Sequence, residues 1–172
     1  MSTPDTPPAS DAALIEAVKS AHRAFPTGVM IVTTAVNGRP YGLAVNAFSS
    51  VSLKPPMVLV CVASTSATYE QMIAVDEIGA NVLAHDQLAV ARRFAISGGD
   101  KFSQVAWSPG ANGAPVLDSA AGHFEISVTQ RIPMFTHTIF IGRVTAASAH
   151  DKPPLIYLGG TFYDGSAMTL AI

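Results

Sequence analysis

The chain has 172 residues, a length that suits a single domain with a sizeable buried core. Apolar residues make up 49% of the sequence and charged residues only 13%, which is about half the usual charged share. The net charge of −2 and the lack of any Lys/Arg cluster argue against nucleic-acid binding through a basic surface.

Composition also bears on location and partners. The longest apolar run, at 57–63, is far too short to span a membrane. The first ten residues lack the basic start and apolar centre of a signal peptide. Cys61 is the single cysteine, which fits a reducing compartment, so we expect a cytoplasmic protein. The low charge suggests a surface covered by a second copy, although a bias towards alanine explains it equally well.

At the N-terminus, residues 1–9 are rich in Pro, Ser and Thr and predict a disordered tail, which leaves 10–172 as one domain. A helix is predicted over 10–24, capped by Ser10 and ended before Pro26. We expect its apolar face to pack on the body of the protein. The residues that recur on this face at helical spacing are Leu14, Val18, Ala21 and Phe25.

The next third of the chain predicts antiparallel β-structure. Two β-rich runs flank Asn37-Gly38, the strongest short-range hairpin signal, because a type I′ turn needs positive φ at both positions. The run "NAFSSVSLKPP" (46–56) alternates like a strand, and 56–63 predicts a buried strand of β-branched residues.

Helices and strands then alternate irregularly. A short helix is predicted over 66–75, with Thr68 or Ser66 as its cap, a strand over 78–84, and a helix over 86–95 capped by Asp86. Residues 97–119 predict a long irregular loop, of the kind that carries function or covers a partner.

Three further strands are predicted at 122–133, 137–150 and 160–165. In the first of them Phe124, Ile126 and Val128 form a dry face, and Glu125, Ser127 and Thr129 form a wet one. Six or seven strands without a βαβ rhythm favour a mainly β fold: a closed or split barrel with short helices at its joints.

Several familiar catalytic patterns are missing from the sequence. It contains no C-x-x-C or H-E-x-x-H, and its five histidines are scattered, so a metal site is not expected. It also lacks the G-x-S-x-G of hydrolases and a G-x-G-x-x-G after a strand. A nucleotide cofactor would therefore need another device to hold it.

One such device is the segment that leads into the predicted helix at 66–75. Ser64, Ser66 and Thr68 place hydroxyls beside the free N–H groups of the helix start, which favours an anion. Simple capping by Ser66 or Thr68 explains the same residues about equally well.

The serines of "NAFSSVS" (46–52) suggest a ligand site of a different shape. Small side chains leave the strand backbone open to a flat polar ligand, and each hydroxyl can donate or accept. A flavin is such a ligand. A strand with one solvent-exposed serine face is an equally good explanation from these residues alone.

The order of these motifs resembles the short-chain flavin reductase family, the reductase components of two-component flavin monooxygenases. The stretches that carry the resemblance are "FPTGV", "NAFSSVSLKPP", "STSAT", "NVLAHDQLAVARRFA", "DKFSQVAW", "HTIFIGRV" and "PLIY", in that order across about 22–165. The resemblance implies an FMN-binding split β-barrel, antiparallel and Greek-key-like, that forms a homodimer with its flavin sites near the subunit interface.

The resemblance also implies a function: hydride transfer from NADH or NADPH to FMN or FAD, with reduced flavin passing to a separate monooxygenase. Carried over by position, the residues that it implies bind the cofactor are Thr27, Asn46, Ala47, Ser49, Ser50, Val51, Ser52, Cys61, Ser64, Ser66, Thr68, Asn81, Val82, Leu83, Ala84, Gln87, Lys101 and Phe102. Within this set Ser64, Ser66 and Thr68 are implied to hold the phosphate-bearing chain, and Lys101 and Phe102 to close over the ring. Read on its own, Cys61 is better explained as a small buried hydrophobe.

The chain departs from the family pattern in four places, one of which is Lys54 in place of a frequent Asp. Ala47 and Leu43 stand where hydroxyl residues are common, and the family's G-D-H is "FTH" here, with Thr136 as the neighbour of His137. The resemblance implies that His137 helps to place the nicotinamide and is the catalytic residue. The weakened motif keeps a second function open, a sensor or electron carrier with tightly held FMN, and a barrel that binds another flat ligand, or a purely structural dimer, is a third.

Overall fold

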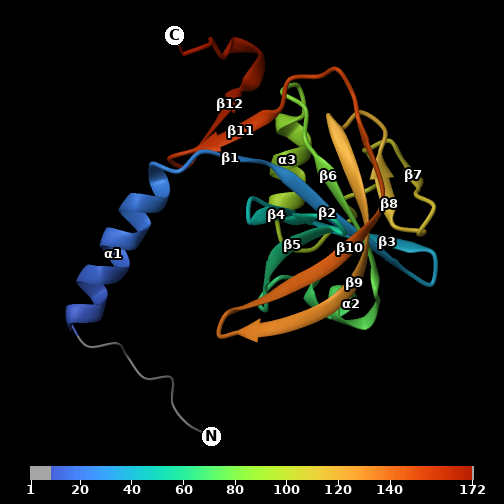
Figure 1. The fold of residues 1–172 in the computed structure, drawn as a ribbon, viewed down its shortest axis with the longest axis horizontal. Coiled ribbons are helices and arrows are strands. Elements are labelled where there is room, and N and C mark those ends of the chain that lie inside the picture. The colour runs from blue at the N-terminus through green and yellow to red at the C-terminus, as the bar shows by residue number, and fades with distance from the viewer. Residues whose placement is uncertain (1–8, 172) are drawn as a thin grey trace, which may run out of the picture.

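The computed structural model describes residues 9–171 (Figure 1). The predicted tail over 1–9 lies outside the described residues except for Ala9, which begins the first helix. The helices are α1 (Ala9–Arg23), α2 (Tyr69–Ala74), α3 (Leu88–Ala95) and a 3-10 turn, η1 (Gly165–Ala167). The strands are β1 (Thr27–Gly28), β2 (Met30–Val36), β3 (Arg39–Val45), β4 (Phe48–Leu53), β5 (Pro56–Ala63), β6 (Glu77–Val82), β7 (Trp107–Pro109), β8 (Pro115–Leu117), β9 (Gly122–Met134), β10 (His137–Ala149), β11 (Leu155–Leu158) and β12 (Thr161–Asp164).

A seven-stranded sheet forms the body of the protein, with the order β3-β2-β6-β9-β10-β5-β4 and antiparallel pairing throughout. Strands β1, β11 and β12 form a separate three-stranded sheet, and β7 and β8 form a hairpin. The prediction of a mainly β, antiparallel fold is confirmed. β3 and β4 are the two edge strands of the large sheet, a position that matters for the site.

The Asn37-Gly38 turn confirms the predicted hairpin. Asn37 has a φ of 52° and Gly38 a φ of 76°, the left-handed pair that a type I′ turn requires. β2 and β3 therefore pair without a register shift, from Val36 opposite Arg39 to Met30 opposite Val45.

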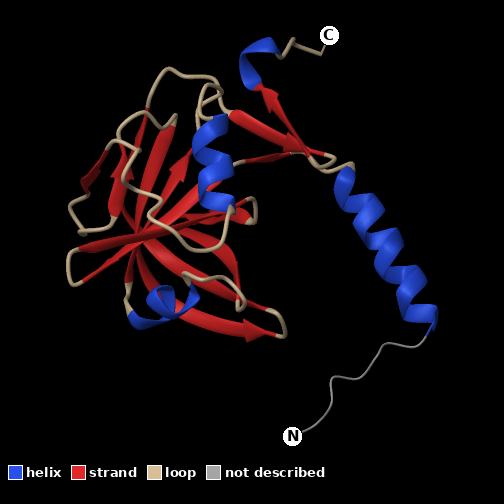
Figure 2. Cartoon of the chain, turned by 180° about the vertical axis from the view of Figure 1, so that it is seen from behind, coloured by secondary structure: helices blue, strands red, loops and turns tan. Residues whose placement is uncertain are grey.

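Two apolar clusters cover opposite faces of β2. Val32 lies in one cluster with alternate residues of β5 and β9, whereas its neighbour Ile31 lies in the other with Phe94 of α3. Figure 2 shows α3 lying against the strands, which is where the second cluster forms. The alternation of β-strand side chains thus gives one strand a share in both cores.

The predicted packing of α1 against the body is wrong. Leu14 is 62% exposed, Val18 is 45% exposed and Phe25 is 68% exposed, and Figure 1 shows α1 directed away from the strands. The helix is amphipathic as expected, but its apolar face has no partner within the described part of this chain. The helix also starts at Ala9, so Ser10 is not its cap.

The predicted caps of the two shorter helices are wrong as well. α2 begins only at Tyr69, and Thr68 makes no side-chain cap because its hydroxyl donates to the carbonyl of Gly42. α3 begins at Leu88 after Gln87, not after Asp86.

The region 97–119 is less irregular than predicted, because it contains the β7–β8 hairpin. This hairpin covers part of the expected wet face of β9, where Thr129 is exposed as predicted, Ser127 is half-buried and Glu125 is buried. Glu125 is only 5% exposed, and its Oε2 accepts a hydrogen bond from the Asn112 N–H at 2.7 Å. The carboxylate therefore holds the loop that joins β7 to β8 against the sheet.

The remaining predicted strands are confirmed as β6, β9, β10 and β12, with ends shifted by at most two residues. β11 was not predicted as a strand, and it joins β1 to β12. Within residues 9–171 no helix has both the length and the apolar character needed to cross a bilayer.

Candidate functional site

A cavity of about 440 Å³ lies beside the start of β4, and we call it the β4 cavity. Its walls are the segments 25–28 and 46–49, together with Met30 and Leu59. Asn46, Ala47 and Ser49 are exposed there, and Thr27 comes from the short strand β1. Four of the residues implied to bind the cofactor thus meet in one cavity, although the chain separates Thr27 from Asn46.

Thr27 carries an unusual feature for a cavity wall. Its Oγ1 is buried and has no hydrogen-bond partner among the described residues. Buried hydroxyls are almost always paired, because an unpaired one costs about 1–3 kcal/mol. The hydroxyl is therefore available to a polar ligand in the β4 cavity.

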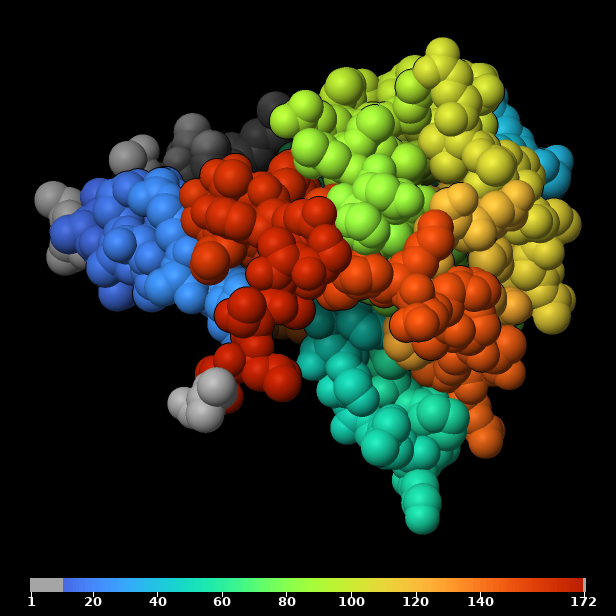
Figure 3. Space-filling view, turned by 90° about the horizontal axis from the view of Figure 1, so that it is seen from above, coloured from blue at the N-terminus to red at the C-terminus, as the bar shows by residue number. Residues whose placement is uncertain are grey.

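The edge position of β4 adds open backbone to this wall. β4 pairs only with β5, and the pairing shifts register between Ser50 and Ser52, so Val51 forms a bulge. Ser49 and Ser50 are exposed, and the Ser52 hydroxyl accepts from the Lys54 N–H. Figure 3 shows the β4–β5 turn (teal) protruding from the body of the molecule. The unpaired edge leaves N–H and C=O groups free for a planar ligand.

The hydroxyls that follow β5 are held by the chain itself. Ser64 donates from both its N–H (2.9 Å) and its Oγ (3.1 Å) to the carbonyl of Thr136. The Ser66 Oγ accepts from the Thr68 N–H, so its proton is still free to be donated. Thr68 is 5% exposed and bonded to Gly42. The Ser66 hydroxyl therefore closes the turn that precedes Tyr69, and it does not cap α2 itself.

His137 lies at the same end of the sheet as this segment. It begins β10 opposite Ala63 and is exposed. Its Nδ1 lies 2.9 Å from the Thr136 hydroxyl, and the Thr136 carbonyl is the group that Ser64 holds. The Thr136 hydroxyl therefore helps to orient the imidazole, and Nε2 is the ring nitrogen without a partner among the described residues.

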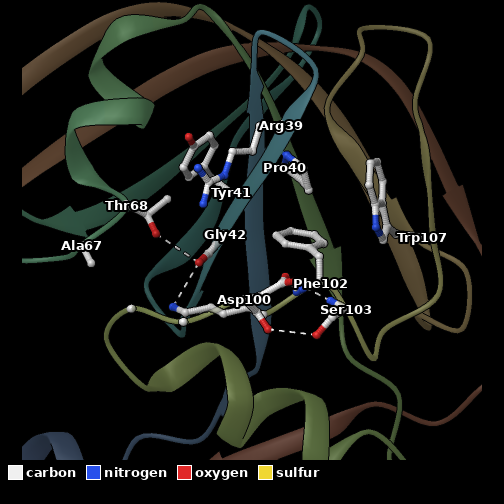
Figure 4. Close-up of a pocket in the computed structure, with 13 residues that line it drawn as sticks. Arg39, Pro40, Tyr41, Gly42, Ala67, Thr68, Asp100, Phe102, Ser103 and Trp107 are labelled. Carbon is white, nitrogen blue, oxygen red and sulfur yellow. Dashed lines mark hydrogen bonds between the residues drawn. The ribbon is translucent and has the colours of Figure 1, made fainter.

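The second cavity, of about 570 Å³, lies at the other edge strand, β3 (Figure 4), and we call it the Lys101 cavity. Its walls are the segments 39–42, 67–68 and 98–103, together with Trp107. Thr68, Lys101 and Phe102 from the implied cofactor set lie here, so Lys101 and Phe102 line a different cavity from Asn46 and Ala47.

The ammonium of Lys101 is held by backbone oxygens alone. Its Nζ donates to the carbonyls of Gly42 (3.3 Å) and Phe94 (3.2 Å) and lies 5.9 Å from the centre of the Phe94 ring. Burial lowers the pKa of Lys101, because the charged form loses solvation. Gly42 accepts from Thr68 as well, so one carbonyl joins the segment after β5 to the loop after α3.

Eleven residues of the implied set line neither cavity, and five of these eleven lie in the interior of the protein. Asn81 is fully buried, donating to the carbonyls of Ile31 and Pro115 and accepting from the Leu117 N–H, so it ties β8 to the sheet. Gln87 is 7% exposed, and its Oε1 accepts from the Ala84 N–H. Val82, Leu83 and Ala84 belong to the packed interior.

Cys61 and Leu43 have simpler surroundings. Cys61 is half-buried, which raises the pKa of its thiol, and its N–H donates to the Ala47 carbonyl beside the β4 cavity. Leu43 is 7% exposed in the core, so a hydroxyl at this position would meet apolar neighbours.

Arg39, Tyr41 and Trp107 are cavity residues that the sequence did not indicate. They come from two segments far apart in the chain, and no local motif joins them. The one available signal was a cation and an aromatic residue at alternate positions straight after the predicted turn. Within the described residues no three His, Cys, Asp or Glu side chains gather as a metal site would require.

The chain is similar in sequence and fold to several known proteins. A family model described as "Flavin reductase like domain" matches residues 22–166. A Rhizobium meliloti protein named "Probable flavin reductase" is 38% identical over 91% of this chain, which spans only 52% of that relative. The reductase component of a Rhodococcus opacus 4-nitrophenol 4-monooxygenase/4-nitrocatechol 2-monooxygenase is 37% identical over 80% of this chain and 74% of its own length.

A solved structure is similar over nearly the whole fold. The Streptomyces globisporus NADH:FAD oxidoreductase, in complex with NAD and FAD fragments, superposes with a TM-score of 0.81 at 32% identity. The match covers 93% of this chain and 96% of that one.

Proposed function

Because the chain belongs to the flavin reductase like domain family, we propose that it is an NAD(P)H-dependent flavin reductase. It passes hydride to FMN or FAD and supplies reduced flavin to a separate monooxygenase. The relative named NADH:FAD oxidoreductase supports the proposed hydride transfer to flavin. The relative named as a monooxygenase reductase component supports the proposed supply of reduced flavin to a monooxygenase. The chain spans about half of the Rhizobium meliloti relative, so activity and partner are inferred here from the shared domain.

The observation that carries the proposal is the β4 cavity with its unpaired Thr27 hydroxyl. A flavin ring is flat and bears several carbonyl and N–H groups along one edge. Thr27, the open edge of β4, and the exposed Asn46 and Ser49 are groups that such a ring can bond. The residues present therefore fit a flavin.

Ser64, Ser66 and Lys101 would hold the phosphate-bearing chain of the flavin. Ser64 and Ser66 follow β5, and the free proton of Ser66 can be donated to a phosphate oxygen. Lys101 supplies a full positive charge there, and its ammonium has no carboxylate partner among the described residues.

The chain's own part in the reaction is to bind, orient and shield. Nicotinamide and flavin supply the hydride chemistry themselves when bound, so no acid–base pair is needed from the protein. His137 positions the nicotinamide through its free Nε2, and Thr136 fixes the ring that carries this nitrogen. Holding the two rings at reacting distance, away from water, is how the protein accelerates the step.

We infer that the large sheet is a split barrel. Its edge strands β3 and β4 are not paired with each other, and Thr68 spans the gap by bonding the segment after β5 to Gly42 of β3. One apolar cluster, including Val60 and Phe140, fills the space that the sheet encloses.

We also infer that the protein works as a homodimer through one open sheet face. The register places apolar side chains of three strands on the same side, each half-buried or exposed. They are Leu59, Cys61, Ile132, Met134, Ile139 and Ile141. A contiguous apolar face of this kind marks an interface, and Leu59 belongs to the β4 cavity as well, so the partner copy borders the flavin.

One assay tests the function. Purified protein is mixed with NADH or NADPH and an excess of FMN or FAD, and the nicotinamide absorbance at about 340 nm is followed. Many turnovers per protein, with flavin released, are expected. A yellow protein that oxidises neither nicotinamide overturns the proposal and favours the sensor or electron carrier with tightly held FMN. A colourless protein that ignores flavin overturns both.

A further inference from the structure

The Lys101 cavity is larger than a flavin phosphate needs. Its volume of about 570 Å³ lies within the roughly 300–1,000 Å³ that small-molecule sites occupy. A phosphate beside Thr68 and Lys101 fills one end and leaves the part between Tyr41 and Trp107 open. Gly98 and Gly99 form another wall, and no atom lies within 4 Å of the position that a side chain would take on either.

The charges around this cavity favour an anion. Arg39 and Lys101 both line it, and neither forms an ion pair within residues 9–171. Asp100 is the one acidic residue in the walls, and its Oδ1 already accepts from the N–H groups of Phe102 and Ser103. Two cationic side chains without ion pairs and one carboxylate that is already hydrogen-bonded give the cavity a net positive charge.

The same cavity also offers aromatic surface. The guanidinium of Arg39 lies 5.4 Å from the centre of the Tyr41 ring, and Figure 4 shows the two side chains next to each other. Across the cavity, Trp107 packs edge-on against Phe102 with ring centres 5.6 Å apart. A flat base can stack on such surfaces, and a guanidinium plane adds to the stacking.

Strand β3 joins the two cavities. Tyr41 lies at the Lys101 cavity and Asn46 at the β4 cavity, five residues apart along extended chain, or about 17 Å at about 3.3 Å per residue. That separation suits a molecule with a flat ring at each end and two phosphates between them.

We propose that the Lys101 cavity holds the adenylate half of FAD and that the chain therefore binds FAD in preference to FMN. Lys101 takes the phosphate that FMN and FAD share. Arg39 takes the second phosphate, and Tyr41 and Trp107 flank the adenine. This inference rests on the proposed function, because it assumes that the flavin ring occupies the β4 cavity.

The test compares the dissociation constants of three flavins of increasing size, measured by flavin fluorescence or calorimetry. Riboflavin, FMN and FAD differ by one phosphate and then by one adenylate, so each step reports one part of the cavity. We expect FAD to bind about tenfold or more tightly than FMN. AMP should compete with FAD but leave FMN binding unchanged, because FMN and AMP occupy separate parts.

Variants of the cavity residues test whether the preference for FAD over FMN arises in the Lys101 cavity. Arg39→Gln changes an exposed side chain and should weaken FAD about tenfold while FMN binding stays within twofold. Tyr41→Leu should act in the same direction. Arg92→Gln, at an exposed position on α3 outside the cavity, is the matched control and should change neither.

Equal affinity for FMN and FAD overturns the inference, as does an Arg39→Gln variant that loses both flavins equally. Turnover with FMN can continue in either case, so the proposed function survives those results. A protein that binds none of the three flavins overturns the inference and the proposed function together.

Discussion

Thr136 is the residue on which the role of His137 depends. Its carbonyl is held by two hydrogen bonds from Ser64, and its hydroxyl contacts the imidazole Nδ1. A neutral hydroxyl thus orients the ring where the family pattern has an acidic residue. The histidine is thus tied to the segment after β5, so the contacts proposed for nicotinamide and for flavin belong to one connected network.

His137→Ala should therefore affect one cofactor and spare the other. We expect the KM for NADH or NADPH to rise about tenfold, the worth of one hydrogen bond, while the dissociation constant for flavin stays within twofold. Steady-state kinetics and flavin titration on the same preparation measure the two. An equal weakening of nicotinamide use and of flavin binding would contradict the proposed role of His137 in positioning the nicotinamide.

Ala47 is the residue where the β4 cavity lacks a hydroxyl. Ala47→Ser should lower the dissociation constant for flavin about threefold to tenfold, because a new hydrogen bond contributes about 0.5–1.5 kcal/mol. Fluorescence titration measures the change. Ala149→Ser, at an exposed site at the end of β10, is the control and should change nothing. Unchanged or weaker flavin binding in Ala47→Ser would mean that the side chain does not face the ring.

At the scale of elements, local patterns were predictable and packing was not. Asn37-Gly38 gave the hairpin because the required φ angles are a property of those two residues. Asn46, Ala47 and Ser49 belong to one contiguous motif and line one cavity, so a local pattern was enough to group them. Glu125 was expected in water because nothing in the sequence says that the β7–β8 hairpin covers it.

The same reasoning explains the residues that were missed. Arg39 and Trp107 meet only after the chain has folded, so their cavity has no sequence motif. Asn81 was assigned to the cofactor, yet its amide holds three backbone groups inside the protein. The sequence does not distinguish a polar side chain that binds a ligand from one that forms hydrogen bonds to the backbone.

The link between β3 and the segment after β5 yields a stability prediction. Thr68→Val removes the hydroxyl that bonds the buried Gly42 carbonyl, and we expect it to cost about 1–2 kcal/mol in the free energy of unfolding. Urea denaturation measures it. Thr129→Val also removes a hydroxyl bonded to a carbonyl, that of Ile141, but at an exposed site, so it should cost under about 0.5 kcal/mol. If both variants lost the same free energy of unfolding, the hydrogen bond between Thr68 and Gly42 would not be a special link between β3 and the segment after β5.

At the scale of the whole molecule, α1 extends its apolar side away from the domain. Leu14, Ile15 and Val18 are all exposed, and helices in water depend largely on packing for their stability. A second copy that meets the open sheet face can cover this helix as well. In the proposed dimer, the stability of α1 would therefore depend on contact with the second copy.

The double variant Leu14→Gln/Val18→Gln should therefore shift the protein from dimer to monomer without unfolding the domain, because neither side chain packs on its own body. Light scattering after size-exclusion chromatography gives the mass, and circular dichroism checks the β-structure. Glu16→Gln, on the same helix, is the control and should leave the mass unchanged. A double variant that remains dimeric would assign the interface to other surfaces.

The unpaired edge of β4 has one more consequence, for the solubility of the protein. An open row of N–H and C=O groups is a template for pairing with any extended chain. The exposed apolar side chains of Val51 (52% exposed) and Leu53 (81% exposed) make the β4 edge more prone to aggregation. The bulge at Val51 and the charge of Lys54 are the devices that limit such strand addition. A flavin bound as proposed would occupy the same groups, so concentrated protein should aggregate more slowly when flavin is present than when it has been removed.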